Sequence, residues 1–379
     1  MAEPLRRQGM DTTLLVMLGA LVLFGLVMLS SASGPIAYQR FGDSWWYVRH
    51  QFLYGILPGI FIFASLSRID YRFWRRWAFA AFAVAVILLV LVFLPGLRAD
   101  WGTSRSWLHI GNYSFQPLEA VKFCLIVFLA DRFSRDMAEE RGGVAKSLLP
   151  FLAALGLVGV LLIAQPDFGG LVLVSGIAFL IYFAAGAPWN HIIALGAVGL
   201  VGAFAAMRTA PYRVQRLMTF MHPENDPLGI GYHINQAYLA IGSGGWFGLG
   251  LGHSRQKFQY LPEVTGDSIF AVMSEELGFV VMMLFLVFMG LLIARCLRLA
   301  REAPDDFGRL LAVGVAAWLL TQSLLNVGSM VGLLPLTGQP LPLVSYGGSS
   351  AMMFLAAMGV LANISSQGIS GAALVQHRK

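Results

Sequence analysis

The chain has 379 residues, of which 57% are hydrophobic and only 12% are charged. An ordinary soluble domain carries about 25% charged residues, so this composition excludes a soluble globular protein of such length. The formal net charge is +6, but the basic residues form no contiguous stripe, and nucleic acid is therefore not expected as a partner.

The hydrophobic residues form long blocks, each close to the roughly 20 residues that let a helix cross a bilayer. Helices are expected because lipid offers no partners for free backbone groups, and the short alternating segments of a β-barrel are absent. We therefore predict an all-α, polytopic membrane protein with a single integral membrane domain over residues 1–379. About ten spans are expected, near residues 13–33, 50–67, 77–95, 117–134, 148–164, 170–187, 190–207, 268–294, 309–332 and 347–365.

The basic residues between these spans predict the orientation. With the N-terminus inside, sixteen Lys and Arg residues fall in inner segments and nine in outer segments. Because cytoplasmic loops carry the excess of positive charge, both termini are expected in the cytoplasm. Cys124 and Cys296 lie in or beside spans, so no disulfide is expected, and no Cys/His metal-ligand spacing is present.

Three outer connections are long and rich in Gly, Pro, aromatic and polar residues, namely 96–116, 208–267 and 333–346. Long loops in compact proteins are usually functional or disordered, and the density of Trp, Tyr, Phe and Leu in these three argues against disorder. The largest, 208–267, is therefore the expected extracytoplasmic site region. Its stretch 211–221 alternates basic and apolar residues, including Arg213 and Arg216, and predicts an amphipathic interfacial helix. That helix could anchor the loop or contact a substrate.

Glu119 and Lys122 begin the fourth span and lie on one helical face, because they are three residues apart. Pro117 suits the first turn of that helix. An ionisable residue at this depth must pair, reach the interface or face a wet cavity. Lys122 is thus either satisfied by Glu119 alone or lines a cavity that binds an anionic lipid headgroup.

Asp267 lies at the start of the eighth span, and position alone favours a helix N-cap for it. Capping and the helix dipole would lower its pKa, whereas apolar surroundings would raise it. Glu275 and Glu276 lie inside the same span, so at least one of them must face a cavity or a positive partner.

Two glycine-rich stretches precede the eighth and the last of these spans. Residues 242–252 are not preceded by a strand, so they do not predict a nucleotide site and instead favour a bent or closely approaching backbone. Residues 342–350, with Ser345, Gly347 and Ser349, predict either a tight turn into the last span or backbone donors that face a cavity.

Five ordered blocks of the chain carry a family resemblance. They are Phe115-Gln116-Pro117 with Glu119 and Lys122, Gln165–Gly169, Asp226–Gly229 with Gly231 and Tyr232, Leu261–Gly278 around Asp267, and Leu341–Ser350. Together they resemble the SEDS family of bacterial cell-shape, division and sporulation proteins, whose branches include FtsW, RodA and SpoVE. Residues 250–257 look more like the FtsW, or division, branch than the elongation branch.

The resemblance implies ten transmembrane helices and a peptidoglycan glycosyltransferase in the bacterial cytoplasmic membrane. Its substrate would be lipid II, polymerised on the outer face, and its partners a class B penicillin-binding transpeptidase and other membrane proteins of the divisome or elongasome. The family's essential aspartate falls on Asp267, and its membrane-embedded lysine and nearby glutamate fall on Lys122 and Glu119. Ser345, Gly347 and Ser349 are further candidate substrate contacts.

The chain departs from the family pattern beside Asp267. The family usually has His-Thr before the aspartate and Phe after it, whereas here Thr265-Gly266 precede it and Ser268 follows. Leu118 likewise replaces a common serine. These changes remove a neighbouring imidazole and keep the carboxylate.

The resulting hypothesis is inverting glycosyl transfer, in which Asp267 takes the proton of the acceptor's 4-hydroxyl. Lys122, Arg213, Arg216 and Mg²⁺ would neutralise the departing pyrophosphate, and Asp267 could alternatively bind that metal. No organic cofactor is expected. The alternatives are a lipid-II flippase, which would depend on Glu275 and Glu276, and a non-enzymatic division scaffold.

Overall fold

The computed structural model of the protein describes residues 9–96, 106–110, 113–138, 146, 148–208, 218–223 and 229–368. Helices dominate this described part, whose one small sheet is an antiparallel hairpin of β1 and β2. The elements are α1 (Thr12–Phe41), α2 (Trp46–Gln51), the π-helix η1 (Phe52–Ile56), α3 (Leu57–Leu66), α4 (Arg72–Leu91), β1 (Leu108–Ile110), β2 (Tyr113–Phe115), α5 (Pro117–Ala138), α6 (Leu148–Ala164), α7 (Phe168–Ala184), α8 (Trp189–Arg208), α10 (Ile230–Ser243), α11 (Ile269–Arg301), α12 (Asp306–Met330) and α13 (Gly348–Gln367).

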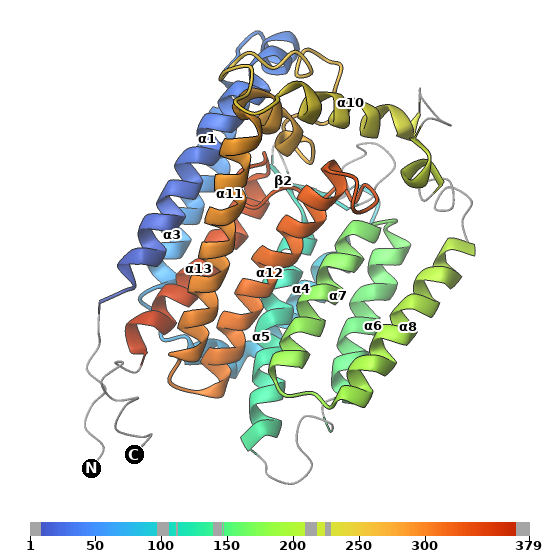
Figure 1. The fold of residues 1–379 in the computed structure, drawn as a ribbon. Helices are drawn as coiled ribbons and strands as arrows, with labels where there is room; N and C mark the ends of the chain where they lie inside the picture. The colour runs from blue at the N-terminus through green and yellow to red at the C-terminus, as the bar shows by residue number, and fades with distance from the viewer. Residues whose placement is uncertain are drawn as a thin grey trace.

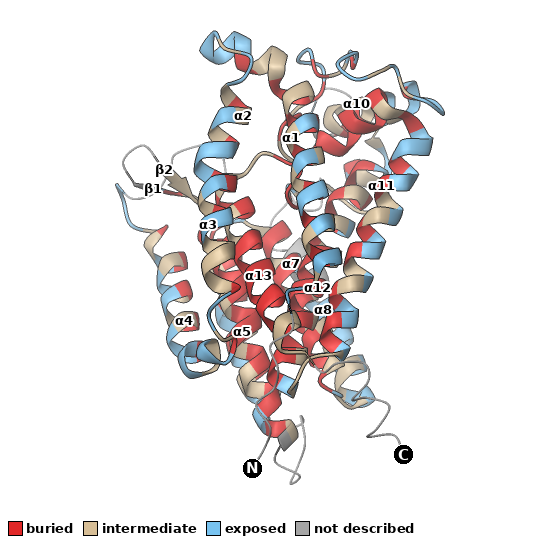
Figure 2. Cartoon of the chain, turned by 90° about the vertical axis from the view of Figure 1, so that its left-hand side faces the viewer, coloured by how far each residue is buried: buried red, intermediate tan, exposed pale blue. Residues whose placement is uncertain are grey.

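The long helices lie side by side as a bundle, and α10 lies across one end of it (Figure 1). Helix α12 packs against α11, α7 and α5, while α13 packs against α3, so these two form the centre of the bundle. Their residues are mostly buried, whereas α1, α3 and α4 have exposed outward faces (Figure 2). Those faces carry large apolar side chains, among them Leu23, Phe61 and Phe79, as a lipid-facing surface requires.

Five helices of the described chain are long and apolar enough to cross a bilayer, namely α1, α4, α11, α12 and α13. Two shorter apolar helices, α6 and α7, accompany them. Each predicted span coincides with a helix, and the second corresponds to α2, η1 and α3, which follow one another without a break. The prediction of a polytopic α-helical membrane protein is confirmed, and the number of ten crossings stays a prediction.

The start of α1 and the end of α13 meet at the end of the bundle opposite α10 (Figure 1). The backbone N–H of Asp11 donates to Oγ of Ser365 at 3.1 Å, and the Asp11 carboxylate pairs with Arg295 of α11. We call this the Asp11 end. The first and the last helix of the described chain thus begin and end on the same side, as an even number of spans predicts.

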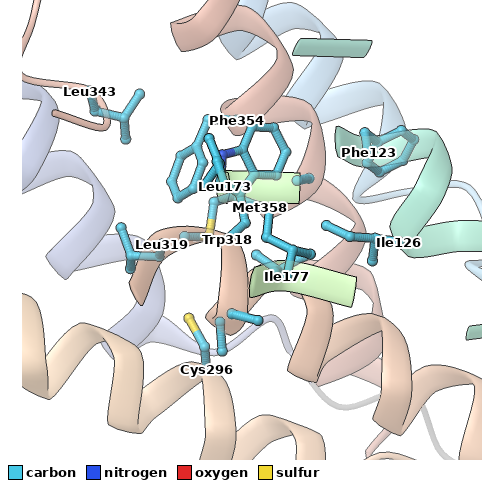
Figure 3. Packing of buried hydrophobic residues seen from close by; sticks show 14 of the residues in the cluster. Phe123, Ile126, Leu173, Ile177, Cys296, Trp318, Leu319, Leu343, Phe354 and Met358 are labelled. Carbon is cyan, nitrogen blue, oxygen red and sulfur yellow. The ribbon is translucent and has the colours of Figure 1, made fainter. Parts of the chain in front are cut away.

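The centre of the bundle is an apolar cluster around Trp318 of α12 (Figure 3). The Trp318 ring meets Phe354 of α13 edge to face, with 5.3 Å between ring centroids. Leu173 and Ile177 of α7 and Met358 of α13 are part of the same cluster. A buried indole N–H needs an acceptor, and the side chain of Gln322 supplies it for Trp318.

Helix α11 is interrupted at Gly278, whose backbone angles of φ 74° and ψ 174° are not helical. The backbone N–H groups of Leu249 and Gly250, in the loop after α10, donate at 2.9 and 3.0 Å to carbonyls of the first part of α11. A Cβ on Gly278 would lie 2.2 Å from the backbone nitrogen of Gly248. The prediction that these glycines permit close backbone approach is confirmed.

Candidate functional site

Asp267 lies in the turn that enters α11, at the α10 end of the bundle. Ser268 occupies the N-cap position of α11, and its side chain makes no capping hydrogen bond. The N-cap that position alone favoured for Asp267 is therefore wrong, because the helix begins one residue later. Oδ1 of Asp267 is buried and has no hydrogen-bond partner among the described residues.

Hydrogen bonds from α12 and from the 339–346 segment hold the Asp267 turn in place. The side-chain amide of Asn326 donates to the backbone carbonyls of Asp267 and Gln339, both at 2.8 Å. Oγ of Ser345 donates to the carbonyl of Gly266 at 2.6 Å, and the N–H of Tyr346 donates to the carbonyl of Thr265 at 2.7 Å. The backbone around Asp267 is thus fixed from two sides.

Lys122 and Glu119 form a fully buried ion pair, with 2.7 Å between Nζ and Oε2. Nζ also donates to Oε1 of Gln322 at 3.0 Å and stands 4.6 Å from the ring centroid of Trp318. Of the two alternatives that the sequence leaves for Lys122, the structure shows the ion pair with Glu119. Since the Lys122 side chain is 0% exposed, its contact with a substrate stays a prediction.

One face of α12 connects this ion pair to the Asp267 turn. Trp318, Gln322 and Asn326 follow one another at intervals of four residues, so they stack along the helix. The Trp318 N–H donates to Oε1 of Gln322 at 2.6 Å, and Nε2 of Gln322 donates to the carbonyl of Pro340 at 2.8 Å. We call Trp318, Gln322 and Asn326 the polar ladder of α12.

The sequence reading missed the polar ladder, although its signal was present. Gln322 and Asn326 are polar residues inside a predicted span, and polar side chains at that depth seldom lack a partner. Asn363 of α13 is a second such case, since its side chain bonds the backbone of Ser67 and Tyr71. The polar residues inside the spans could be recognised from the sequence. Their hydrogen-bond partners could not, because these are distant in the sequence.

A histidine lies next to the residue that follows Asp267. Nε2 of His233, in α10, is 2.6 Å from Oγ of Ser268. Burial lowers the pKa of His233 to about 4, so the imidazole is neutral at physiological pH. An imidazole from another element thus contacts the residue that follows Asp267, and local sequence could not reveal this contact.

Burial and hydrogen bonding act in opposite directions on the pKa of Asp267, and burial has the larger effect. Burial, together with the smaller effect of the nearby negative charge of Glu263, raises the pKa of Asp267 to about 7. Backbone N–H groups of Asp267 and Ser268 lower it, but they do not outweigh burial. A carboxyl with such a pKa can accept a proton near neutral pH.

Glu275 and Glu276 bind the loop that follows α10. The Glu276 carboxylate pairs with Lys257 at 2.8 Å and accepts from Ser31 of α1, so the expectation of a positive partner is confirmed. The Glu275 carboxylate accepts from the hydroxyl of Ser254 and from the N–H of Arg255. Both glutamates are thus engaged in holding this loop.

Three further candidates for substrate contact, Ser345, Gly347 and Ser349, lie at the start of α13 or just before it. The N–H of Gly347 donates to Oε1 of Gln51 at 2.9 Å, while Oγ of Ser349 is buried without a partner among the described residues. Both hydroxyl contacts of Ser345 are used within the fold, since it also accepts from the N–H of Leu341. Arg213 and Arg216, with most of the predicted amphipathic helix, lie outside the described residues.

Oxygen ligands for a metal are few at this site. Within the described part of the chain, no group of three or more His, Cys, Asp and Glu side chains is placed to share an ion. Asp267 and Glu263 could supply carboxylate oxygens, and a hard cation such as Mg²⁺ commonly takes only one or two of these together with phosphate oxygens and water. The residues present therefore fit Mg²⁺ only together with a phosphorylated substrate.

The chain is similar to known proteins over almost its whole length. A family model described as "Cell cycle protein", for FtsW, RodA and SpoVE, matches residues 11–369. Stage V sporulation protein E of Bacillus subtilis is 39% identical over 95% of this chain and 98% of its own length. A probable peptidoglycan glycosyltransferase FtsW of Trichlorobacter lovleyi is 36% identical over 96% of this chain and 95% of its own.

Solved structures agree with the sequence matches. A chain from a structure concerned with polymerization and crosslinking by a peptidoglycan synthase complex superposes with a TM-score of 0.78 at 30% identity, covering 94% of this chain and 97% of that one. Rod shape determining protein RodA of Thermus thermophilus superposes with a TM-score of 0.69 at 28% identity, covering 95% and 98%. The chain is therefore a multi-pass bacterial membrane protein that belongs to the FtsW/RodA/SpoVE family, as its five sequence blocks indicated.

Proposed function

We propose that this chain is a peptidoglycan glycosyltransferase in which Asp267 is the general base. The activity is the one that the names of its FtsW relatives carry. The observation that supports the role of Asp267 is its buried Oδ1, which no described residue binds, on a carboxyl whose pKa is about 7. Such a group is held in place, is half ionised near neutral pH, and has an acceptor position free.

The substrate would be lipid II, polymerised at the α10 end of the bundle, which faces outward by the positive-inside rule. The 4-hydroxyl oxygen of the acceptor sugar attacks the anomeric carbon of the donor. The bond from that carbon to the pyrophosphate oxygen breaks, and the configuration inverts. Asp267 takes the hydroxyl proton, and undecaprenyl pyrophosphate leaves as an anion, so a second carboxyl is not needed as an acid.

The departing pyrophosphate requires positive charge. Arg213 and Arg216 are the candidates in the large loop, and Mg²⁺, if bound, would supply further neutralisation with Asp267 and Glu263 as its protein ligands. Ser345, Gly347 and Ser349 stay candidates for substrate contact, and the Ser349 hydroxyl is buried without a partner among the described residues. Lys122 and Glu119 would support this site through Gln322, whose amide holds Pro340.

A class B penicillin-binding transpeptidase and other division or elongation proteins are the proposed partners. The resemblance to a chain from a peptidoglycan synthase complex supports an assembly of this kind. The flippase alternative depended on Glu275 and Glu276, and those carboxylates are instead engaged with Lys257, Ser254 and neighbouring backbone. No observation favours transport over bond formation.

The experiment is polymerisation of lipid II by the purified protein, compared with Asp267→Asn. Asparagine keeps the size of the side chain and cannot take the proton, so glycan synthesis should fall to the background level while the protein stays folded. Undiminished synthesis by a well-folded Asp267→Asn protein would reject the base assignment. Product chains formed without a partner protein would also exclude the scaffold alternative.

A further inference from the structure

Four arginines line a hollow of about 390 Å³ where α4 begins and α5 ends. These helix ends lie at the Asp11 end of the bundle, opposite α10 (Figure 1). Arg72, Arg75 and Arg76 come from the first turns of α4, and Arg135 comes from the last turn of α5. These two helices pack against each other, so the four side chains converge from both sides of one groove. The proposed reaction uses none of them.

One carboxylate, that of Asp131, orients two of these guanidinium groups by binding only the Nε of each. Nε of Arg75 and Nε of Arg135 both donate to Oδ1 of Asp131, at 3.3 and 2.8 Å. The guanidinium carbon of Arg75 also stands 5.9 Å from the ring centroid of Phe307. The positions of both groups are therefore set before any ligand arrives.

Arg72 is held in the same way. Its Nε donates to Asp305 at 3.0 Å, its Nη1 donates to Gln367 at 3.1 Å, and its guanidinium carbon is 4.9 Å from the centroid of the Tyr71 ring. The backbone N–H of buried Tyr71 in turn donates to Oδ1 of Asn363 of α13 at 2.9 Å. The wall of the hollow is thus tied to the centre of the bundle.

Because Asp131 binds Arg75 and Arg135 through Nε, the terminal Nη atoms of these two arginines are left for a ligand. Among the described residues, the Nη atoms of Arg75 and Arg135 make no hydrogen bond to a carboxylate, and Arg76 has no ion pair. Guanidinium groups bind phosphate oxygens through such paired N–H groups, and pre-oriented forks lose little entropy in doing so. The chemistry of the hollow is therefore that of a phosphate site.

The surroundings indicate where the phosphate comes from. Helix α4 is one of the candidate membrane spans, and its first turns expose the large apolar side chains of Phe73 and Trp77, each 49% exposed. Aromatic residues beside basic ones mark the level of lipid headgroups, and the cytoplasmic leaflet carries anionic lipid. We propose that the hollow binds the phosphodiester headgroup of an anionic phospholipid of the cytoplasmic leaflet.

The test is a titration of phosphatidylglycerol into the purified full chain in a neutral detergent, followed by the midpoint of thermal unfolding. Because the ligand binds the folded state, phosphatidylglycerol should raise the midpoint, and phosphatidylcholine should not. Inorganic phosphate at the same concentration should have little effect. An equal rise with inorganic phosphate would overturn the assignment to a lipid.

Two double variants with the same change in charge distinguish a specific binding site from general electrostatic attraction. Arg76→Gln with Arg135→Gln should weaken the response to phosphatidylglycerol about tenfold, because two of the four forks are lost. Arg298→Gln with Arg301→Gln is the control. It removes the same amount of charge from exposed positions in the last turn of α11, outside the hollow, and should leave the response to phosphatidylglycerol unchanged. Equal responses of the two double variants would overturn the proposal.

A milder change guards against loss of folding. Arg76→Gln alone breaks no ion pair with a described residue, so the protein should fold and bind phosphatidylglycerol several-fold more weakly. Arg76→Lys keeps the charge and removes the fork, and it should weaken binding as well. Full binding by both single variants would overturn the role of Arg76 in the site.

Discussion

The side-chain amide of Asn326 donates to the backbone carbonyl of Asp267 at 2.8 Å, and the same nitrogen donates to the carbonyl of Gln339. One side chain of α12 therefore joins the turn that carries the proposed base to the segment that leads into α13. The position of the Asp267 carboxyl depends on this contact, since Asp267 itself lies outside a regular helix.

Asn326→Leu should lower glycan synthesis at least about tenfold, because a small displacement of a reacting group has a large effect on rate. It should also destabilise the protein by about 1–3 kcal/mol, since buried carbonyls lose their donor. Ser323→Ala is the matched control on α12, because the Ser323 hydroxyl is buried without a partner among the described residues. Full synthesis by a stable Asn326→Leu protein would contradict the positioning role.

The rate of glycan synthesis should rise with pH through the pKa of Asp267, which burial places near 7. The ionised form is the base, so activity is lost as the pH falls below that value. Glu263→Gln removes a negative charge that raises this pKa, and the acidic limb should therefore shift to lower pH. A pH–rate profile of both proteins tests this, and a shift to higher pH would contradict the proposed interaction.

Lys122→Met should destabilise the protein by about 3–5 kcal/mol, because it leaves the buried carboxylate of Glu119 without its counter-ion. Combining it with Glu119→Gln removes that charge, so thermal stability should recover in part. If the pair acts only by supporting Gln322, glycan synthesis should recover along with stability. Recovery of stability without synthesis would indicate that Lys122 contacts the substrate.

Gly278→Ala should destabilise the protein by more than about 1 kcal/mol and lower activity, since Gly278 has a positive φ and its Cβ would meet the backbone of Gly248. Gly290→Ala, in a regular part of the same helix with nothing within 4 Å of its Cβ, should be neutral or slightly stabilising. Thermal unfolding of the two variants in detergent compares them directly. Equal stability would mean that the break in α11 can relax.

The sequence by itself determined the class of the protein and the place of its membrane helices. Long apolar blocks can only be satisfied as helices in lipid, and that constraint acts within each segment. The ordered motifs around Lys122, Asp267 and Ser345 likewise indicated the family, because they are local patterns. Position at a helix edge, however, favoured a cap for Asp267, and the start of α11 at Ile269 showed otherwise.

Only the tertiary structure decided which groups meet. His233 is 35 residues from Ser268, and Lys122 is 200 residues from Gln322, yet each pair is in hydrogen-bond contact. Such contacts depend on how the helices pack, which no local pattern encodes. The pKa of Asp267 was undecided for the same reason, since burial by distant segments, rather than its own helix terminus, sets the pKa near 7.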